Sequence, residues 1–377
     1  MKLLNNKFIK FLLVGFVLLL GSGLSLAQDT TDWIDGHPPE STYQKAKIVK
    51  ITDTSPLDLS DTFTYDGITK DVTFLLLSGD YKDQEVTTQV SYNDESEVAK
   101  IGSIVVVEEI YRVDGEILYL ISDNYRLNSL WLVFGIFLAL LFIFSGWRGV
   151  SSLVGLIFSV IILAGFTIPQ IVAGHSPLLI SVVSAFAIAL ISIYLSHGFR
   201  TRTTIAVVST CLTIVIAIGL AYFFTYFTKL SGMGSEEAFQ LSVWGPMSNI
   251  DFRGLLLGGI IIGALGVLDD VTTTQAAAID EISQANKRLT QKDLYIKGFS
   301  VGREHITSLV NTLALAYVGA SLPLLLIFIA NPQPIWAIIN SQMIAEEVIR
   351  TLVGSIALIL AVPITTWIAA YWFSKNR

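Results

Sequence analysis

Two adjacent carboxylates, Asp269 and Asp270, directly follow an apolar run that begins at Gly254. Read as a helix with a rise of 1.5 Å per residue, the stretch from Leu255 to Leu268 covers roughly 21 Å, less than a full bilayer crossing. An aspartate at such a depth costs on the order of 3 kcal/mol, so these residues usually face a bundle interior, a wet cavity or an ion path. We therefore expect both carboxylates inside the membrane. The alternative is that the span ends at Leu268 and both lie in interfacial water.

The two aspartates point in helical directions that differ by about 100°. Asp270 shares its direction with a stripe of small residues, which consists of Gly259, Gly263 and Gly266. Small residues let membrane helices approach closely. Asp270 is therefore predicted to face a neighbouring helix, and Asp269 the space beside that contact.

A second stripe of small and polar residues is expected on the apolar segment after Gly302, and it consists of His305, Ser308, Thr312, Ala316, Gly319 and Pro323. Two such helices joined by a short link are natural partners, so we expect the aspartates near this stripe. A carboxyl group held out of bulk water beside hydroxyls can take up and release a proton. The residues predicted to line a proton or cation relay, or a substrate path, are Asp269, Asp270, Thr273, Asn311, Thr312 and His305. The alternative is that these side chains only pin two helices together by hydrogen bonds.

Farther along the first helix, Asp280 and Glu281 repeat the directions of the two aspartates three turns later. This second pair is expected to meet cytoplasmic water. Arg303 could form an ion pair with Asp280 or Glu281, or it could serve only as positive charge on the inner side.

The composition limits the classes of protein to consider. With 53% hydrophobic and 15% charged residues, the 377-residue chain is predicted to be a polytopic α-helical membrane protein. A net charge of −7 provides no basic surface, so no nucleic acid partner is expected. The single cysteine, Cys211, excludes an intrachain disulfide, and the four histidines lack metal-ligand spacing. We therefore expect neither a metal nor another cofactor.

No enzymatic motif is found in the sequence. There is no His-Glu-x-x-His for a zinc protease and no Gly-x-x-x-x-Gly-Lys for a nucleotide phosphate. Asp269 and Asp270 diverge on one helix and cannot share a proton as the carboxylates of an aspartyl protease do. We therefore expect that the protein is not an enzyme.

The N-terminal part of the chain is predicted to be exported. Residues 1–27 combine a basic region, a short apolar region and the small-residue site Ser25-Leu-Ala27, as in a cleaved signal peptide, with an uncleaved anchor as the alternative. Residues 28–128 are predicted to form a β-rich domain, a small barrel or sandwich similar to an OB-type fold. The expected strands are Tyr43–Thr52, Asp71–Leu77, Glu85–Tyr92, Ser103–Tyr111 and Glu116–Ile121.

Residues 129–377 are predicted to form a domain of about seven transmembrane helices. The expected spans are Leu130–Ser145, Val150–Val172, Leu178–Leu195, Thr203–Thr228, Gly254–Asp270, Ile306–Ile329 and Val348–Phe373. Positive charge should gather on the cytoplasmic side. With the N-terminal domain outside, the inner connections carry ten basic residues, namely Arg148, Arg200, Arg202, Lys287, Arg288, Lys292, Lys297, Arg303, Lys375 and Arg377. The outer connections carry only Lys229, Arg253 and Arg350. We therefore expect the C-terminus in the cytoplasm.

The stretch from Gly263 to Ile282, with Leu-Asp-Asp-Val-Thr-Thr-Thr-Gln at its centre, and the stretch from Gly302 to Tyr317 resemble the YibE/F family of bacterial multi-pass membrane proteins. The resemblance covers nearly the whole chain and implies a β-rich exported segment followed by about seven spans in the bacterial inner membrane. The short run Val267-Leu-Asp-Asp is also similar to the aspartate-bearing helix of resistance–nodulation–division transporters, which are driven by protons. This chain lacks their second half and their pair of large exported domains.

The function expected from these patterns is a membrane permease or permease subunit, coupled to protons or cations through Asp269 and Asp270. Its partners would be the lipid bilayer and a small solute or ion of unknown identity, and oligomerisation is left open. The alternative is a non-transporting assembly or sensor protein whose exported β domain binds a protein partner.

Overall fold

The computed structural model describes residues 41–53, 68–92, 100–111, 117–243, 247–330 and 334–375. The chain divides into two compact units. One is Thr31–Leu140, and the other is Leu141–Arg377 together with Met1–Thr30. The predicted signal peptide, residues 1–27, lies outside the described residues. The predicted domain boundary after residue 128 stays a prediction.

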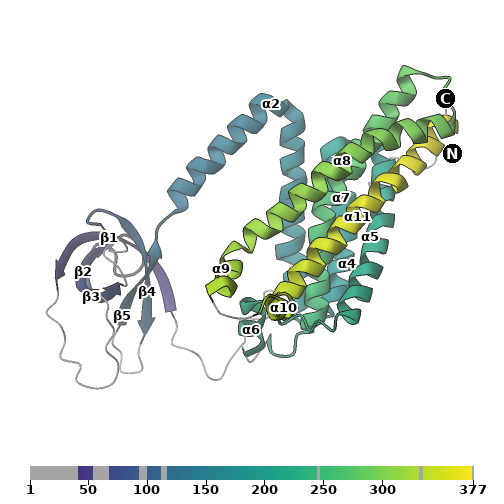
Figure 1. Ribbon diagram of the computed structural model, residues 1–377. Helices are drawn as coiled ribbons and strands as arrows, with labels where there is room; N and C mark the ends of the chain where they lie inside the picture. The colour runs from purple at the N-terminus through teal and green to yellow at the C-terminus, as the bar shows by residue number, and fades with distance from the viewer. Residues whose placement is uncertain are drawn as a thin grey trace. The chain divides into compact units, whose positions relative to one another are not determined.

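The first unit contains a five-stranded antiparallel sheet in the order β3-β2-β1-β4-β5 (Figure 1). Its strands are β1 (Ser41–Asp53), β2 (Ile68–Leu76), β3 (Glu85–Tyr92), β4 (Ile104–Tyr111) and β5 (Ile117–Asn124). Alternate residues of the three central strands, among them Ile48, Phe74 and Val107, form its core. The edge strands meet where Thr88 Oγ1 donates a hydrogen bond to the Tyr119 carbonyl at 2.7 Å, so the sheet curls into a half-barrel. All five predicted strands are confirmed to within a few residues, and the OB-type assignment stays a prediction.

The rest of the described chain is helical. The elements are α2 (Leu127–Ile162), the π-helical turn η3 (Leu163–Thr167), α3 (Ile168–Val172), α4 (Pro177–His197), α5 (Thr201–Phe227), α6 (Glu236–Val243), α7 (Phe252–Ala285), α8 (Gln291–Ala320), α9 (Leu322–Ala330), α10 (Ile335–Asn340) and α11 (Gln342–Lys375). Six helical segments are long and apolar enough to cross a membrane: Leu127–Trp147, Gly149–Val172, Pro177–His197, Thr201–Phe227, Phe252–Ala285 and Gln342–Lys375. The first two belong to α2 and its continuation, and α2 is kinked at Gly146, which has a φ of 54°.

The predicted span Ile306–Ile329 is not one continuous helix. It is divided between α8, which ends at Ala320, and α9, which carries Pro323 at its second position. The N-terminal turns of α8 are polar, so α8 does not qualify as a span by length and hydropathy. Helix α8 nevertheless runs beside α11 in Figure 1. The structure thus contains six candidate spans among the described residues, and the seventh stays a prediction.

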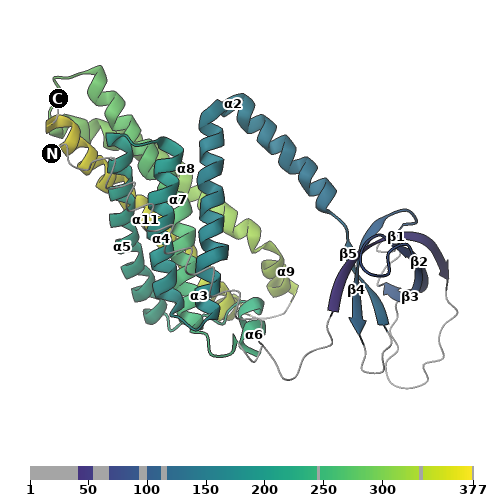
Figure 2. The same cartoon turned by 180° about the vertical axis from the view of Figure 1, so that it is seen from behind.

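Helix α7 is the centre of the helical unit. It packs against α4, α5 and α11, which surround it in Figure 2. Side chains such as Ile261, Leu268 and Ile279 are fully or almost fully buried in the shared core. Because three neighbours cover α7, polar side chains on this helix can be enclosed between helices.

Candidate functional site

Asp269 lies on the side of α7 that faces α4. The Ser192 hydroxyl donates a hydrogen bond to Asp269 Oδ2 over 3.2 Å. The other carboxylate oxygen, Oδ1, is buried and has no hydrogen-bond partner among the described residues. Buried polar atoms are normally paired, so an orphaned carboxylate oxygen indicates a place for a proton, a water molecule or a cation.

Close packing at small residues positions this carboxylate. A Cβ atom added at Gly155 would lie only 2.9 Å from Ser196 Oγ and 3.3 Å from Ser192 Oγ, so the glycine lets α2 approach the two serines. Towards α5, the hydroxyls of Thr210 and Thr272 are hydrogen-bonded at 2.6 Å and join that helix to α7. The aspartate is therefore held on a helix that is tied to its neighbours on two sides.

A small cavity lies one turn beyond Asp269. It has a volume of about 50 Å³ and is lined by His197, Arg202, Thr203, Thr273 and Ala277. Thr203 is only 2% exposed, and its hydroxyl oxygen has no partner among the described residues. Thr273 Oγ1 donates to the backbone carbonyl of Asp269 at 2.9 Å, so this part of the cavity wall lies one helical turn from the aspartate. A water molecule needs roughly 10–15 Å³, so the cavity has room for a short water chain.

A larger polar cavity of about 560 Å³ opens next to the small one, and Arg202 lines both. Its other walls include the two predicted acidic residues. Glu281 lies 3.7 Å from the Arg202 guanidinium, and Asp280 accepts a hydrogen bond from Gln284 at 2.8 Å. The predicted partner Arg303 lies instead over the Phe299 ring, 5.6 Å from its centroid.

Asp270 occupies a different environment from its neighbour. Its side chain is exposed, and no hydrogen bond or ion pair to it is found within the described parts of the chain. A Cβ atom added at Gly266 would meet nothing within 4 Å, and one at Gly263 would meet only the Tyr317 hydroxyl at 3.3 Å. The predicted glycine stripe is therefore not a closely packed helix contact.

The structure does not bring the second predicted stripe to the aspartates. Ser308, Asn311 and Thr312 are exposed, His305 is half-buried, and no hydrogen bond joins any of them to Asp269 or Asp270 in the described residues. The expected contact is wrong in this structure because α8 packs mainly against α11. The roles predicted for these residues are not tested by their positions.

Helices α7 and α8 approach closely at another point. The Gln275 side-chain amide donates to the Gly298 carbonyl and to Thr366 Oγ1, both at 2.8 Å. A Cβ atom added at Gly302 would lie 2.3 Å from a Val362 methyl and 2.9 Å from Gln275 Oε1. The close contact therefore involves Gly298 and Gly302 of α8, which belong to neither of the two predicted stripes.

Comparison with known families identifies the helical part of the chain. A family model described as YibE/F-like protein matches residues 133–375. The chain belongs to the YibE/F-like family. The search of curated proteins and the search of solved structures each found no match.

The YibE/F-like region contains every candidate site residue, whereas all five strands precede it. It also contains functional candidates that the sequence did not reveal, namely Ser192, His197, Thr203 and Gln275. The spacing of Ser192 and Ser196 by one helical turn was a usable signal for a polar face on α4. In the described residues, no group of three or more His, Cys, Asp and Glu side chains is arranged to hold a metal ion.

Proposed function

We propose that this protein is a membrane permease, or the permease subunit of a larger assembly, in which Asp269 takes up and releases a proton or a small cation. The observation that carries the proposal is the Oδ1 atom of Asp269, which is buried and has no hydrogen-bond partner among the described residues, on the helix that packs against α4, α5 and α11. Ionisable residues at such depth are costly and usually serve an ion or substrate path.

The two neighbouring cavities lie along α7 on the way towards Asp269, and the nearest residue of their lining to it on this helix is Thr273. In the proposal, ions enter through the larger cavity, whose lining carries the carboxylates of Asp280 and Glu281 beside the guanidinium groups of Arg200 and Arg202. They then pass the cavity at His197, Thr203 and Thr273 and reach Asp269 beside Ser192. Asp270, Asn311, Thr312 and His305 lie off this route, so they would take part only if α8 moved against α7.

The proposal also needs a membrane topology. We take α8 and α9 together as a seventh crossing, which places the β unit, as an OB-type domain, outside the cell and the larger cavity at the cytoplasmic face of a bacterial inner membrane. The excess of basic residues on the same side as this cavity supports that orientation.

The competing proposal is an assembly or sensor protein that transports nothing. It is favoured by the position of the β unit, which precedes the YibE/F-like region and exposes the large side chains of Tyr43 and Ile101, at 62% and 65%. Under this proposal, the β unit binds a protein partner and Asp269 only ties α7 to α4. Removal of residues 28–128 would then abolish function, whereas neutralising Asp269 would not.

The test replaces each aspartate by asparagine in the full chain reconstituted in liposomes. Dicyclohexylcarbodiimide is apolar and modifies protonated carboxyl groups, so we expect it to label Asp269, as located by mass spectrometry. Potential-driven proton flux, followed with an internal pH dye, should fall to the level of protein-free liposomes in Asp269→Asn. Asp270→Asn is the matched control, since it removes the adjacent but exposed carboxylate.

Normal flux in a folded Asp269→Asn protein, together with no labelling of Asp269 in the wild type, would refute the relay. Equal loss of flux in both variants would show instead that the pair acts together. Thermal unfolding of each variant in detergent separates these results from misfolding.

A further inference from the structure

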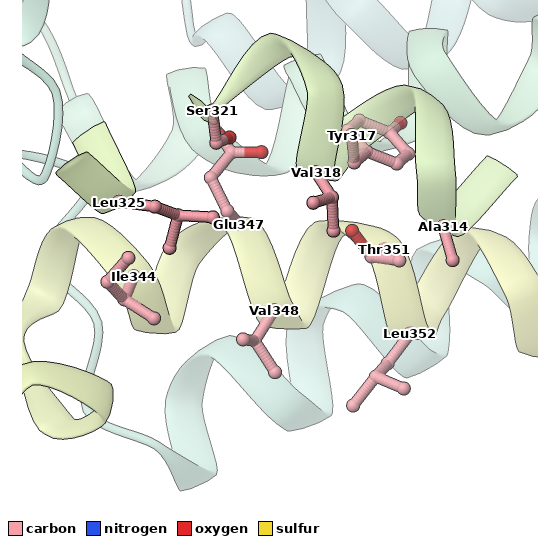
Figure 3. Close-up of a pocket in the computed structure, with 10 residues that line it drawn as sticks. All are labelled: Ala314, Tyr317, Val318, Ser321, Leu325, Ile344, Glu347, Val348, Thr351 and Leu352. Atoms are coloured by element: carbon pink, nitrogen blue, oxygen red, sulfur yellow. The ribbon is translucent and has the colours of Figure 1, made fainter. Parts of the chain in front are cut away.

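A mostly apolar cavity of about 220 Å³ lies between α8–α9 and α11, apart from Asp269 and its route (Figure 3). Its walls include Val318, Leu325, Val348 and Leu352. Between these apolar walls, Tyr317, Ser321, Glu347 and Thr351 contribute polar groups. The cavity therefore combines a large apolar surface with a single acidic side chain.

The Glu347 carboxylate is incompletely paired. Its side chain is 33% exposed and lies beside Ser321 in Figure 3. Its ion pair with Arg350, from Oε1 to Nη2, is 3.5 Å long, beyond the usual length of a hydrogen bond. No hydrogen bond to either carboxylate oxygen is found in the described residues, and the ion pair with Arg350 involves Oε1 alone.

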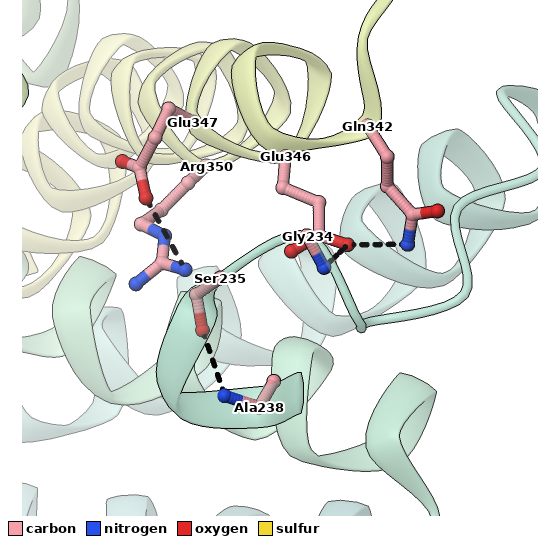
Figure 4. Close-up of polar contacts among 7 residues, drawn as sticks. All are labelled: Gly234, Ser235, Ala238, Gln342, Glu346, Glu347 and Arg350. Atoms are coloured by element: carbon pink, nitrogen blue, oxygen red, sulfur yellow. Dashed lines mark hydrogen bonds and ion pairs between the residues drawn. The ribbon is translucent and has the colours of Figure 1, made fainter. Parts of the chain in front are cut away.

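The neighbouring residue on α11 explains this orientation. Glu346 is 5% exposed, and its Oε1 atom accepts hydrogen bonds from the Gly234 N–H at 3.1 Å and from Gln342 at 2.9 Å (Figure 4). Successive residues of a helix point about 100° apart, so anchoring Glu346 in the bundle turns Glu347 towards the cavity. The Arg350 side chain is directed towards α7, where Nη1 would lie 4.0 Å from a Cβ added at Gly259.

We propose that this cavity binds a lipophilic cation, that is, an apolar molecule carrying an ammonium or comparable positive group. The carboxylate of Glu347 would meet the charge, and the Tyr317 ring would add a cation–π contact. The apolar walls would cover the rest of the molecule, which could enter from the lipid between two helices. This inference concerns binding alone and does not rest on proton coupling at Asp269.

The test compares two probes of nearly the same shape, phenyltrimethylammonium and neutral tert-butylbenzene. Binding to the full chain in lipid nanodiscs is measured by equilibrium dialysis, with subtraction of the uptake by protein-free nanodiscs. Glu347→Gln keeps the space and removes the charge, so we expect cation affinity to fall about tenfold while affinity for the neutral probe is unchanged. Ala314→Phe fills the cavity and should weaken both probes.

Glu236→Gln is the matched control, because Glu236 is exposed on α6 and does not line the cavity. It should leave both affinities unchanged. Equal wild-type affinity for the two probes would overturn the proposal, as would an undiminished preference for the cation in Glu347→Gln. If Glu347→Gln fails to fold, the Ala314→Phe variant provides the test. The proposal is overturned if this variant binds the cation as tightly as the wild type does.

Discussion

At the residue scale, Gln275 is the uncharged polar residue of the helical unit whose substitution is expected to lower the free energy of unfolding most. Its amide is 1% exposed and bonds to both α8 and α11. Gln275→Met keeps the approximate shape but leaves the Gly298 carbonyl and the Thr366 hydroxyl without this donor, so we expect a loss of about 1 kcal/mol in the free energy of unfolding. Reversible unfolding in mixed micelles measures this loss in the free energy of unfolding. The control is Gln284→Met, which replaces an exposed amide whose hydrogen bond within the described residues is to Asp280, and an equal loss there would contradict the assignment.

A second prediction at this scale concerns the β unit. Burial, with the nearby Glu109 charge as the next cause, raises the pKa of the Tyr119 phenol to about 12. A raised pKa means that the fold favours the neutral phenol. Its contribution to stability is therefore complete below the ordinary value of about 10 and is lost as the pH rises through about 12. Ultraviolet titration of phenolate absorbance, wild type minus Tyr119→Phe, should show this late ionisation, and a difference curve centred near pH 10 would contradict it.

At the element scale, the contact of α8 with α7 and α11 depends on Gly302. An added methyl group there would meet Val362 and Gln275, whereas one at Gly319, on the same helix, would meet nothing within 4 Å. We expect Gly302→Ala to destabilise the protein by about 1–3 kcal/mol through overpacking. Gly319→Ala should be neutral or stabilising by up to about 1 kcal/mol, since alanine favours the helix. Thermal unfolding in detergent compares them, and equal melting temperatures would disprove the close contact.

The elements themselves could be predicted because their signals are local. Strand alternation located β1 to β5, and apolar runs located the six candidate spans. The helix neighbours could not be predicted in the same way. A stripe of glycines shows that a face can be approached, but not which helix approaches it. The bond between Ser192 and Asp269 joins residues 77 positions apart, and the carboxylate's partner came from α4 rather than from the expected α8.

Local signals also did not predict that the expected span 306–329 is divided between two helices, α8 and α9. The apolar content of 306–329 predicts a crossing, but Pro323 lacks the N–H that would continue the helix hydrogen bonds, and α8 ends at Ala320. In α11, Pro363 lies within an uninterrupted helix. A proline in an apolar run therefore does not by itself predict whether the helix ends there.

At the scale of the whole molecule, the proposed route requires one orientation in the membrane, because the larger polar cavity must open to the cytoplasm. Cysteines introduced at two exposed positions can report this orientation. The single native thiol is first removed by Cys211→Ser. Ile101→Cys lies in the β unit, and Gln284→Cys lies in the wall of the larger cavity. In intact bacterial cells, a membrane-impermeant maleimide should label the first cysteine, and it should label the second only after the cells are permeabilised. The reverse pattern would place the basic connections outside, against the positive-inside tendency, and the cation entry proposed here would then face the wrong side of the membrane.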